Sequence, residues 1–190
     1  MSRATDAANF ATRKTSLMTK KKTAEETCAY STRIVMPNET NTLGNLMGGQ
    51  LLNWMDINAA IAAHRHCRRV VVTASVNNVS FNRPIRLGDI VTIRSKVSRS
   101  FTSSMEIYSD VWVEDHISGE QIKSNESIYT FVAVDQNGAP IEVPELIPQT
   151  DEEKERFAGA LRRRQLSLIL AGKMDPQKAT ELKDLFLGSS

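Results

Sequence analysis

One carboxylate stands alone in a long apolar stretch of this sequence. Between Thr40 and His64 the only formally charged residue is Asp56. The residues around it show helical spacing, with an apolar face made of Leu51, Leu52, Met55, Ala59, Ala62 and Ala63. A buried carboxylate is costly unless it is paired, hydrogen-bonded or functional. Two interpretations follow. Asp56 can share a narrow polar stripe with Asn53 and face water, or it can act as a general base or nucleophile.

The segment before this predicted helix is rich in turn-forming residues. Gly48 and Gly49 fall where the helix should begin, and free N–H groups at a helix start can bind an oxyanion. They can also be no more than a tight turn. Asn45 can orient a water molecule or a carbonyl group, or it can cap the helix, and the two roles are compatible.

Other chemistries lack their sequence signatures. The chain contains no GxSxG, HExxH or P-loop pattern, and Cys28 and Cys67 form no metal spacing. His64 and His66 lie two positions apart, but no third ligand completes a plausible set. We therefore expect no metal and no cofactor.

Composition narrows the class of protein. The 190 residues are 41% hydrophobic and 24% charged, with a net charge of +2, which is typical of one soluble globular domain. The charge does not indicate nucleic-acid binding, and no apolar run is long enough to span a membrane. With neither a secretory signal nor paired cysteines, the sequence favours a cytoplasmic protein.

The predicted elements are one strand, one long helix and then four strands. The helix is apolar on nearly all sides, so we expect it to be buried in the middle of the domain. The strands are expected at 27–36, 70–81, 89–101, 105–114 and 121–134, the last four as an antiparallel meander. A long antiparallel sheet wrapped around a central helix is the hot-dog fold, of the α+β class.

Composition changes at both ends of this predicted core. Residues 1–24 are basic and aperiodic and are expected to form a mobile arm. The hot-dog domain is assigned to 25–148. Residues 149–190 are expected to form additional C-terminal helices, the first opened by a capping box of Thr150 and Glu153.

Three motifs resemble those of one family. The stretch PNETNTLGNLMGGQLLNWMD, the stretch SFNRPIRLGD and the stretch TFVAVDQNGAP follow one another in the order and at the separations seen in hot-dog acyl-CoA thioesterases of the cytosolic acyl-CoA hydrolase type. The resemblance covers about residues 27–144. One departure is Glu39, where the family more often has Asp or His.

The resemblance implies hydrolysis of an acyl-CoA thioester to a free carboxylic acid and coenzyme A, in fatty-acid metabolism. It assigns the chemistry to Asp56, with Asn45 and the amides of Gly48 and Gly49 positioning water and the thioester carbonyl. Coenzyme A is then part of the substrate rather than a cofactor. Its contacts are expected at Arg83, Ser103 and Ser104, and with less support at Arg68 and Arg99.

The resemblance also implies a homodimer, or a hexamer built as a trimer of dimers, with no nucleic-acid or membrane partner. In the family the catalytic pair faces across the dimer interface, so Asn45 of one subunit should meet Asp56 of the other. Two other functions remain open: an acyl-CoA-binding sensor that does not hydrolyse its ligand, and a dehydratase. A dehydratase would need a histidine at the start of the helix, and none is present there.

Overall fold

The computed structural model describes residues 21–77, 79 and 83–187. The chain divides into two compact units, Met1–Ile147 and Pro148–Ser190. The predicted N-terminal arm lies outside the described residues up to position 20.

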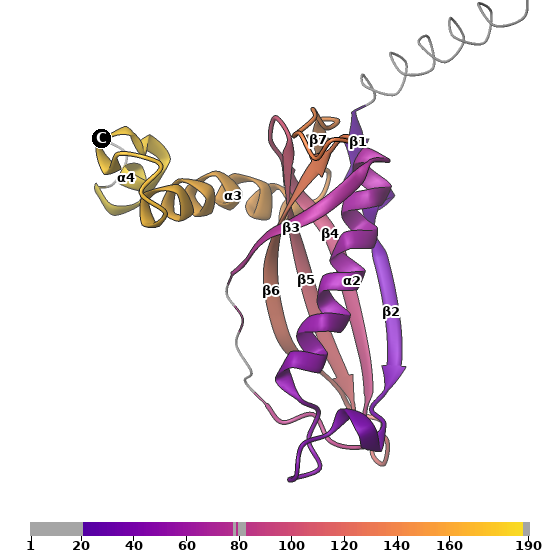
Figure 1. Ribbon diagram of the computed structural model, residues 1–190. Coiled ribbons are helices and arrows are strands. Elements are labelled where there is room, and N and C mark those ends of the chain that lie inside the picture. The colour runs from indigo at the N-terminus through magenta and orange to yellow at the C-terminus, as the bar shows by residue number, and fades with distance from the viewer. Residues whose placement is uncertain (1–20, 78, 80–82, 188–190) are drawn as a thin grey trace, which may run out of the picture. The chain divides into compact units, whose positions relative to one another are not determined.

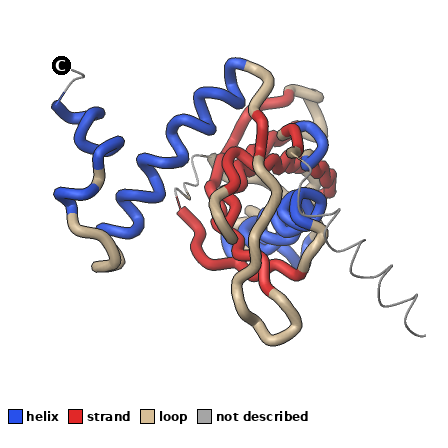
Figure 2. The backbone as a smooth tube through the Cα atoms, turned by 90° about the horizontal axis from the view of Figure 1, so that it is seen from above, coloured by secondary structure: helices blue, strands red, loops and turns tan. Residues whose placement is uncertain are grey.

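The first unit is a curled antiparallel sheet with one long helix in its concave face, α2 (Gly48–Cys67). Seen from above, the strands curl around one side of this helix (Figures 1 and 2). The strand order is β2-β4-β5-β6-β3, formed by β2 (Ala29–Ile34), β3 (Val70–Asn77), β4 (Ile90–Ser100), β5 (Ser104–Glu114) and β6 (Gln121–Val134). This architecture confirms the predicted hot-dog fold and α+β class.

The predicted meander is correct for β4, β5 and β6 but wrong for β3. That strand pairs with β6 at the far edge of the sheet instead of joining β4. The connection from β3 to β4 runs from Asn77 to Ile90 and includes Pro84, so it is too long for a hairpin turn. Residues 78, 80 and 81 of the predicted strand lie outside the described residues. Strand β3 leaves one of its edges without a partner strand among the described residues.

Helix α2 has one buried face rather than being buried all round. Leu51, Trp54, Met55 and three small alanines pack against the sheet, and the alanines allow the backbones to approach closely. On the outward side Ile57 is 46% exposed and Ile61 is 42% exposed. The prediction of a fully enclosed helix is therefore wrong for the single chain, because the curled sheet covers only one side.

A short parallel pair of strands lies at the C-terminal end of α2. It joins β1 (Lys22–Thr23) to β7 (Leu146–Ile147). Lys22 Nζ donates to the main-chain oxygen of Arg65, and His66 Nε2 lies 2.7 Å from the Pro144 oxygen. Lys22 and Thr23 thus pair with the end of the first unit, although they precede residue 25, the predicted start of the domain. Two 3₁₀ turns, η1 (Glu25–Thr27) and η2 (Pro37–Glu39), flank β2.

The second unit contains α3 (Asp151–Leu170), η3 (Pro176–Lys178) and α4 (Thr180–Leu187). The predicted capping box is present: the Thr150 hydroxyl accepts the Glu153 N–H at 3.2 Å, and Glu153 accepts the Thr150 N–H. Across 21–77, 79 and 83–187, no helix has both the length and the apolarity needed to cross a membrane.

Candidate active site

Asp56 lies on the side of α2 that faces β3. Its carboxylate is half-buried and accepts a hydrogen bond of 2.9 Å from the hydroxyl of Thr73. Thr73 and Asp56 are thus brought together by the turn from α2 into β3, which reverses the chain direction. Asp56 is the only carboxylate of the helix. It is partly exposed rather than sealed in a dry pocket, and it has a hydroxyl partner on the edge strand β3.

The loop before α2 is organised by Asn41. Its side-chain oxygen accepts the N–H groups of Leu43 at 2.9 Å and Asn45 at 3.2 Å, and its own N–H donates to the Asn45 oxygen at 2.8 Å. Gly44 has a φ of 74°, a left-handed conformation that closes this tight loop. The main chain of Asn45 is therefore fixed by Asn41.

The two glycines open the helix as predicted. Gly48 and Gly49 are its first two residues, so their N–H groups have no acceptor inside the helix. A methyl group placed on Gly49 would find no heavy atom within 4 Å. The space beside the Gly49 Cα is therefore open, so a ligand could approach the helix start here.

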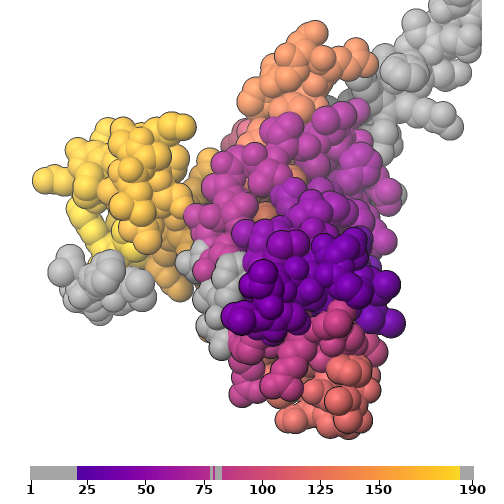
Figure 3. Space-filling view, turned by 60° about the horizontal axis from the view of Figure 1, so that its bottom comes forward, coloured from indigo at the N-terminus to yellow at the C-terminus, as the bar shows by residue number. Residues whose placement is uncertain are grey.

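A hollow of about 280 Å³ brings several predicted site residues together. Its walls come from the loop before α2, the helix start and the segment that leads into β4, and are formed by Asn41, Asn45, Leu46, Gly48, Leu51, Arg83, Pro84 and Ile85. Figure 3 shows this end of the unit, where the early chain in indigo meets later segments. Asn45, Gly48 and Arg83 are thus neighbours. Asp56 does not line the hollow, since it lies eight residues beyond Gly48, about 12 Å along the helix axis.

The segment carrying Arg83 is held by a buried carboxylate. Asp89 is only 4% exposed, accepts the Arg86 N–H at 2.8 Å and lies 3.3 Å from Nδ1 of His116. The Leu46 N–H donates to the Ile85 oxygen at 2.7 Å, which ties this segment to the loop before α2. The predicted motif with Gly88 and Asp89 therefore supports the walls of the site.

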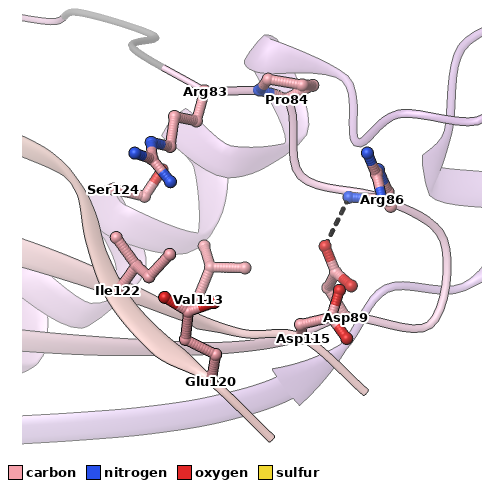
Figure 4. A pocket seen from close by; sticks show the side chains of 9 residues that line it. All are labelled: Arg83, Pro84, Arg86, Asp89, Val113, Asp115, Glu120, Ile122 and Ser124. Atoms are coloured by element: carbon pink, nitrogen blue, oxygen red, sulfur yellow. Dashed lines mark hydrogen bonds between the residues drawn. The ribbon is translucent and has the colours of Figure 1, made fainter. Parts of the chain in front are cut away.

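A second hollow, of about 260 Å³, lies on the other side of Arg83. Figure 4 shows the Arg83 side chain extending toward Ser124, above an apolar floor of Val113 and Ile122. Acidic side chains lie at the opposite end of this hollow. Arg83 and Pro84 line both hollows, so Arg83 can reach a ligand in either one.

Four other predicted contacts lie at the opposite end of the sheet. Arg68 ends α2 in a left-handed conformation, about 30 Å from Gly48 along the helix. Ser103, Ser104 and Arg99 surround the turn between β4 and β5, where Arg99 stacks over Phe101. Within one chain the structure does not bring these four residues to the hollow at the start of α2.

Tyr129 of β6 contacts the same helix, since its hydroxyl donates to the Leu52 main-chain oxygen at 3.3 Å. Burial raises the pKa of Tyr129 to about 12; a bond to Ser127 opposes this rise, and the negative charge of Asp56 adds to it. Among the described residues, no group of three His, Cys, Asp or Glu side chains could hold a metal ion.

Sequence reasoning missed Thr73 and gave Asn41 no role. A hydroxyl in a strand rich in valine is unremarkable in sequence, and only the fold shows that it faces Asp56. Asn41 belongs to PNETNTLGN, part of the first motif that resembles the acyl-CoA thioesterases. Its place in that motif could have marked it as a candidate site residue.

Comparison with known proteins identifies the class. The sequence pattern of the thioesterase superfamily matches residues 43–120. A Bacillus subtilis protein described as an uncharacterized acyl-CoA thioester hydrolase is 43% identical over 129 residues, 68% of this chain and 75% of the relative. The chain belongs to the thioesterase superfamily. Within it, the predicted resemblance to the acyl-CoA hydrolases is confirmed. The chain is also 34% identical to the rat cytosolic acyl-CoA thioester hydrolase; that match covers 76% of this chain but only 39% of the rat protein.

Solved structures agree with this assignment. The acyl-CoA hydrolase of Bacillus cereus is 37% identical with a TM-score of 0.77, and the match covers 90% of this chain and all of that one. The acyl-CoA hydrolase of Staphylococcus aureus, solved with butyryl coenzyme A, is 35% identical with a TM-score of 0.75, over 81% of this chain and 96% of that one. A hexameric acyl-CoA thioesterase is 35% identical with a TM-score of 0.76, and the match covers 81% of this chain and 97% of that one.

Three further structures of the S. aureus enzyme carry single alanine replacements, at an asparagine, an aspartate and a threonine. In that chain the aspartate follows the asparagine by 15 positions, and the threonine follows the aspartate by 17.

Proposed function

We propose that this protein hydrolyses acyl-CoA to a free carboxylic acid and coenzyme A, with Asp56 as the reacting carboxylate. The observation that carries the proposal is the hydrogen bond between Asp56 and Thr73, which lie 17 positions apart. That is the spacing of the aspartate and threonine replaced in the S. aureus enzyme. A lone carboxylate oriented by a strand hydroxyl is suited to general-base or nucleophilic work.

The same spacing favours Asn41 as the asparagine of the site. It precedes Asp56 by 15 positions, like the asparagine replaced in the S. aureus enzyme. Asn45, the residue favoured by sequence reasoning, lines the same hollow and remains the competing candidate. Both lie beside the helix start, so either carboxamide could direct the thioester carbonyl or the attacking water.

Two chemical routes use these groups. As a base, Asp56 takes a proton from water while the water oxygen attacks the thioester carbonyl. The oxyanion forms in front of the amides of Gly48 and Gly49, and the C–S bond then breaks to release coenzyme A, which regains the proton. As a nucleophile, Asp56 displaces the thiolate to form a mixed anhydride, which water hydrolyses. Neither route needs a resident cofactor or metal.

The site is shared between two subunits in this proposal. Within one chain Asp56 and the asparagine-lined hollow are separate, and the free edge of β3 is open beside Asp56. Pairing of two copies along this edge would cover Thr73 and bring the halves of two sites together. The assembly is a dimer, or a hexamer as a trimer of dimers, supported by the hexameric relative.

Contacts to coenzyme A are proposed at Arg83 first, because it reaches both hollows beside the helix start. Arg68, Arg99, Ser103 and Ser104 can take part only if a second subunit brings that end of the sheet to the site. A cytoplasmic location is proposed on the basis of the cytosolic rat relative.

The test is release of free thiol from a series of acyl-CoA chain lengths. Asp56→Asn should lower kcat by about 100-fold or more, the loss expected for a general base. Asn53→Ala, on the exposed side of the same helix, serves as the control and should leave kcat unchanged. Binding of acyl-CoA with no thiol release by the wild-type protein would instead identify a sensor.

A further inference from the structure

Two strands hold the same turn of α2 from different sides. Strand β3 reaches the side chain of Asp56 through the Thr73 hydroxyl. Strand β6 reaches the main chain, because the Tyr129 hydroxyl donates to the Leu52 carbonyl oxygen at 3.3 Å. In an α-helix the carbonyl of residue 52 is the acceptor for the N–H of residue 56. The phenol and the Asp56 amide therefore share one acceptor.

Tyr129 is well placed for this contact. It is completely buried on the inner face of β6, and its ring stacks on Phe131 with centroids 6.3 Å apart. Tyr129 is paired with Val76, and Phe131 with Thr73, across the ladder between β6 and β3. Tyr129 therefore lies on the strand next to the one that carries the Asp56 partner.

The phenol remains a donor over the whole working pH range. Burial, with a smaller contribution from the Asp56 charge, keeps the pKa of Tyr129 near 12. A phenol that ionised would lose the bond to the Leu52 carbonyl, which only accepts. The negative charge of Asp56 also disfavours ionisation of the Tyr129 phenol.

We propose that Tyr129 is a positioning residue for hydrolysis, fixing the Leu52–Asp56 turn so that the carboxylate is held at the angle the reaction needs. It does not touch the substrate. Packing alone would be satisfied by phenylalanine, so the hydroxyl is the part of Tyr129 that this role requires. The inference rests on the proposed role of Asp56.

The decisive variant is Tyr129→Phe, which keeps the ring and removes the hydrogen bond. We expect kcat to fall about tenfold, since small displacements of a reacting group have effects of this order or larger. KM should stay within about twofold, because substrate contacts are untouched. Tyr108→Phe is the matched control: it removes the same group from the opposite face of the neighbouring strand β5 and should leave kcat unchanged. Thermal unfolding of both variants verifies that each is folded at the assay temperature.

A double-mutant cycle separates this inference from the proposed function. If Tyr129 acts only through Asp56, the Tyr129→Phe change should cost nothing further in an Asp56→Asn background. A further tenfold loss in that background would overturn the inference, as would a wild-type kcat for Tyr129→Phe while Asp56→Asn is inactive. Near wild-type turnover by Asp56→Asn would instead refute the proposed function.

Discussion

The Asp56 carboxylate lies where the central helix meets the free edge of the sheet. One oxygen is held by Thr73, and the group is only half-buried in the single chain. A second copy that covered β3 would therefore bury Asp56 further without a change in the fold of either subunit. The reactivity of this residue depends on what closes the edge beside it.

The roles of the two asparagines can be separated by substitution. Asn41→Ala should lower kcat by about 100-fold if its carboxamide takes part in the reaction, whereas Asn45→Ala should then cost less than about tenfold. Thiol release and KM are measured for both. Because Asn41 also holds the loop through its side-chain oxygen, Asn41→Asp serves as a control that keeps this acceptor. The reverse ranking of the two alanine variants would restore Asn45 as the catalytic residue.

Gly49→Ala should separate stability from activity. The added methyl group meets open space in the single chain and favours the helix, so the free energy of unfolding should rise by about 0.5 kcal/mol. The same methyl group would crowd an oxyanion at the helix start, so kcat/KM should fall at least about tenfold. Urea unfolding and thiol release are the two measurements. Unchanged kcat/KM would show that the substrate does not approach this amide.

At the residue scale, sequence was informative where a residue was chemically out of place. A charge in an apolar helix and two adjacent glycines could be recognised without the fold. Thr73 could not, because threonine is an ordinary strand residue and its role depends on lying opposite Asp56. The proposed preference for Asn41 over Asn45 rests on the positions of replaced residues in a relative.

At the element scale, periodicity predicted which segments form helices and strands but not how all the strands pair. The bounds of β6 and the start of α3 were predicted correctly, since turn residues and a capping box mark them. The place of β3 was not predicted, because side-chain alternation shows that a segment is a strand and carries no information about its neighbour.

The contact between α2 and the segment before β7 should make stability depend on pH. Burial is the main cause that lowers the pKa of His66 from 6.5, and Nδ1 has no partner among the described residues. The His66 imidazole therefore binds a proton more readily in the unfolded chain than in the folded chain. Stability should be full above about pH 6.5 and fall as the pH drops toward the folded-state pKa.

The measurement is urea unfolding between pH 7.5 and 5 for the wild type and His66→Gln, values chosen to bracket that range. Glutamine can still donate to the Pro144 oxygen and does not titrate. The stability of the variant should thus vary less with pH. Parallel profiles for the two proteins would mean that His66 is not the group responsible.

The second unit should be dispensable for catalysis. Helix α2 and every strand of the sheet lie in the first unit, Met1–Ile147. A chain ending at Gln149 should fold and release thiol with a kcat within about threefold of wild type, because no group of the proposed site is lost. Gel filtration would show whether its oligomeric state changes. An insoluble or inactive product would mean that residues beyond 149 complete the core or the site.

At the scale of the whole molecule, a shared site predicts recovery of activity from inactive variants. Asp56→Ala and whichever asparagine variant is inactive are unfolded and refolded together. A mixed dimer carries both substitutions in one site and none in the other. Random mixing gives about half mixed dimers, so about a quarter of wild-type activity should return. Each variant refolded alone is the control. Mixed dimers without activity would place the whole site within one chain.

The two free edges of the sheet differ in a way that bears on fibril formation. Strand β2 carries a charge at Arg33 and is followed by Pro37, features that discourage further strand pairing. Strand β3 reads VVVTASVN, with no charge and no proline, and its Val70 is 63% exposed. Short uncharged segments rich in β-branched residues are the kind that stack into cross-β structure. In the proposed dimer this edge is covered. Dilution that separates its two copies would expose such a template on every chain, so under this proposal dissociation and amyloid-like aggregation should be linked.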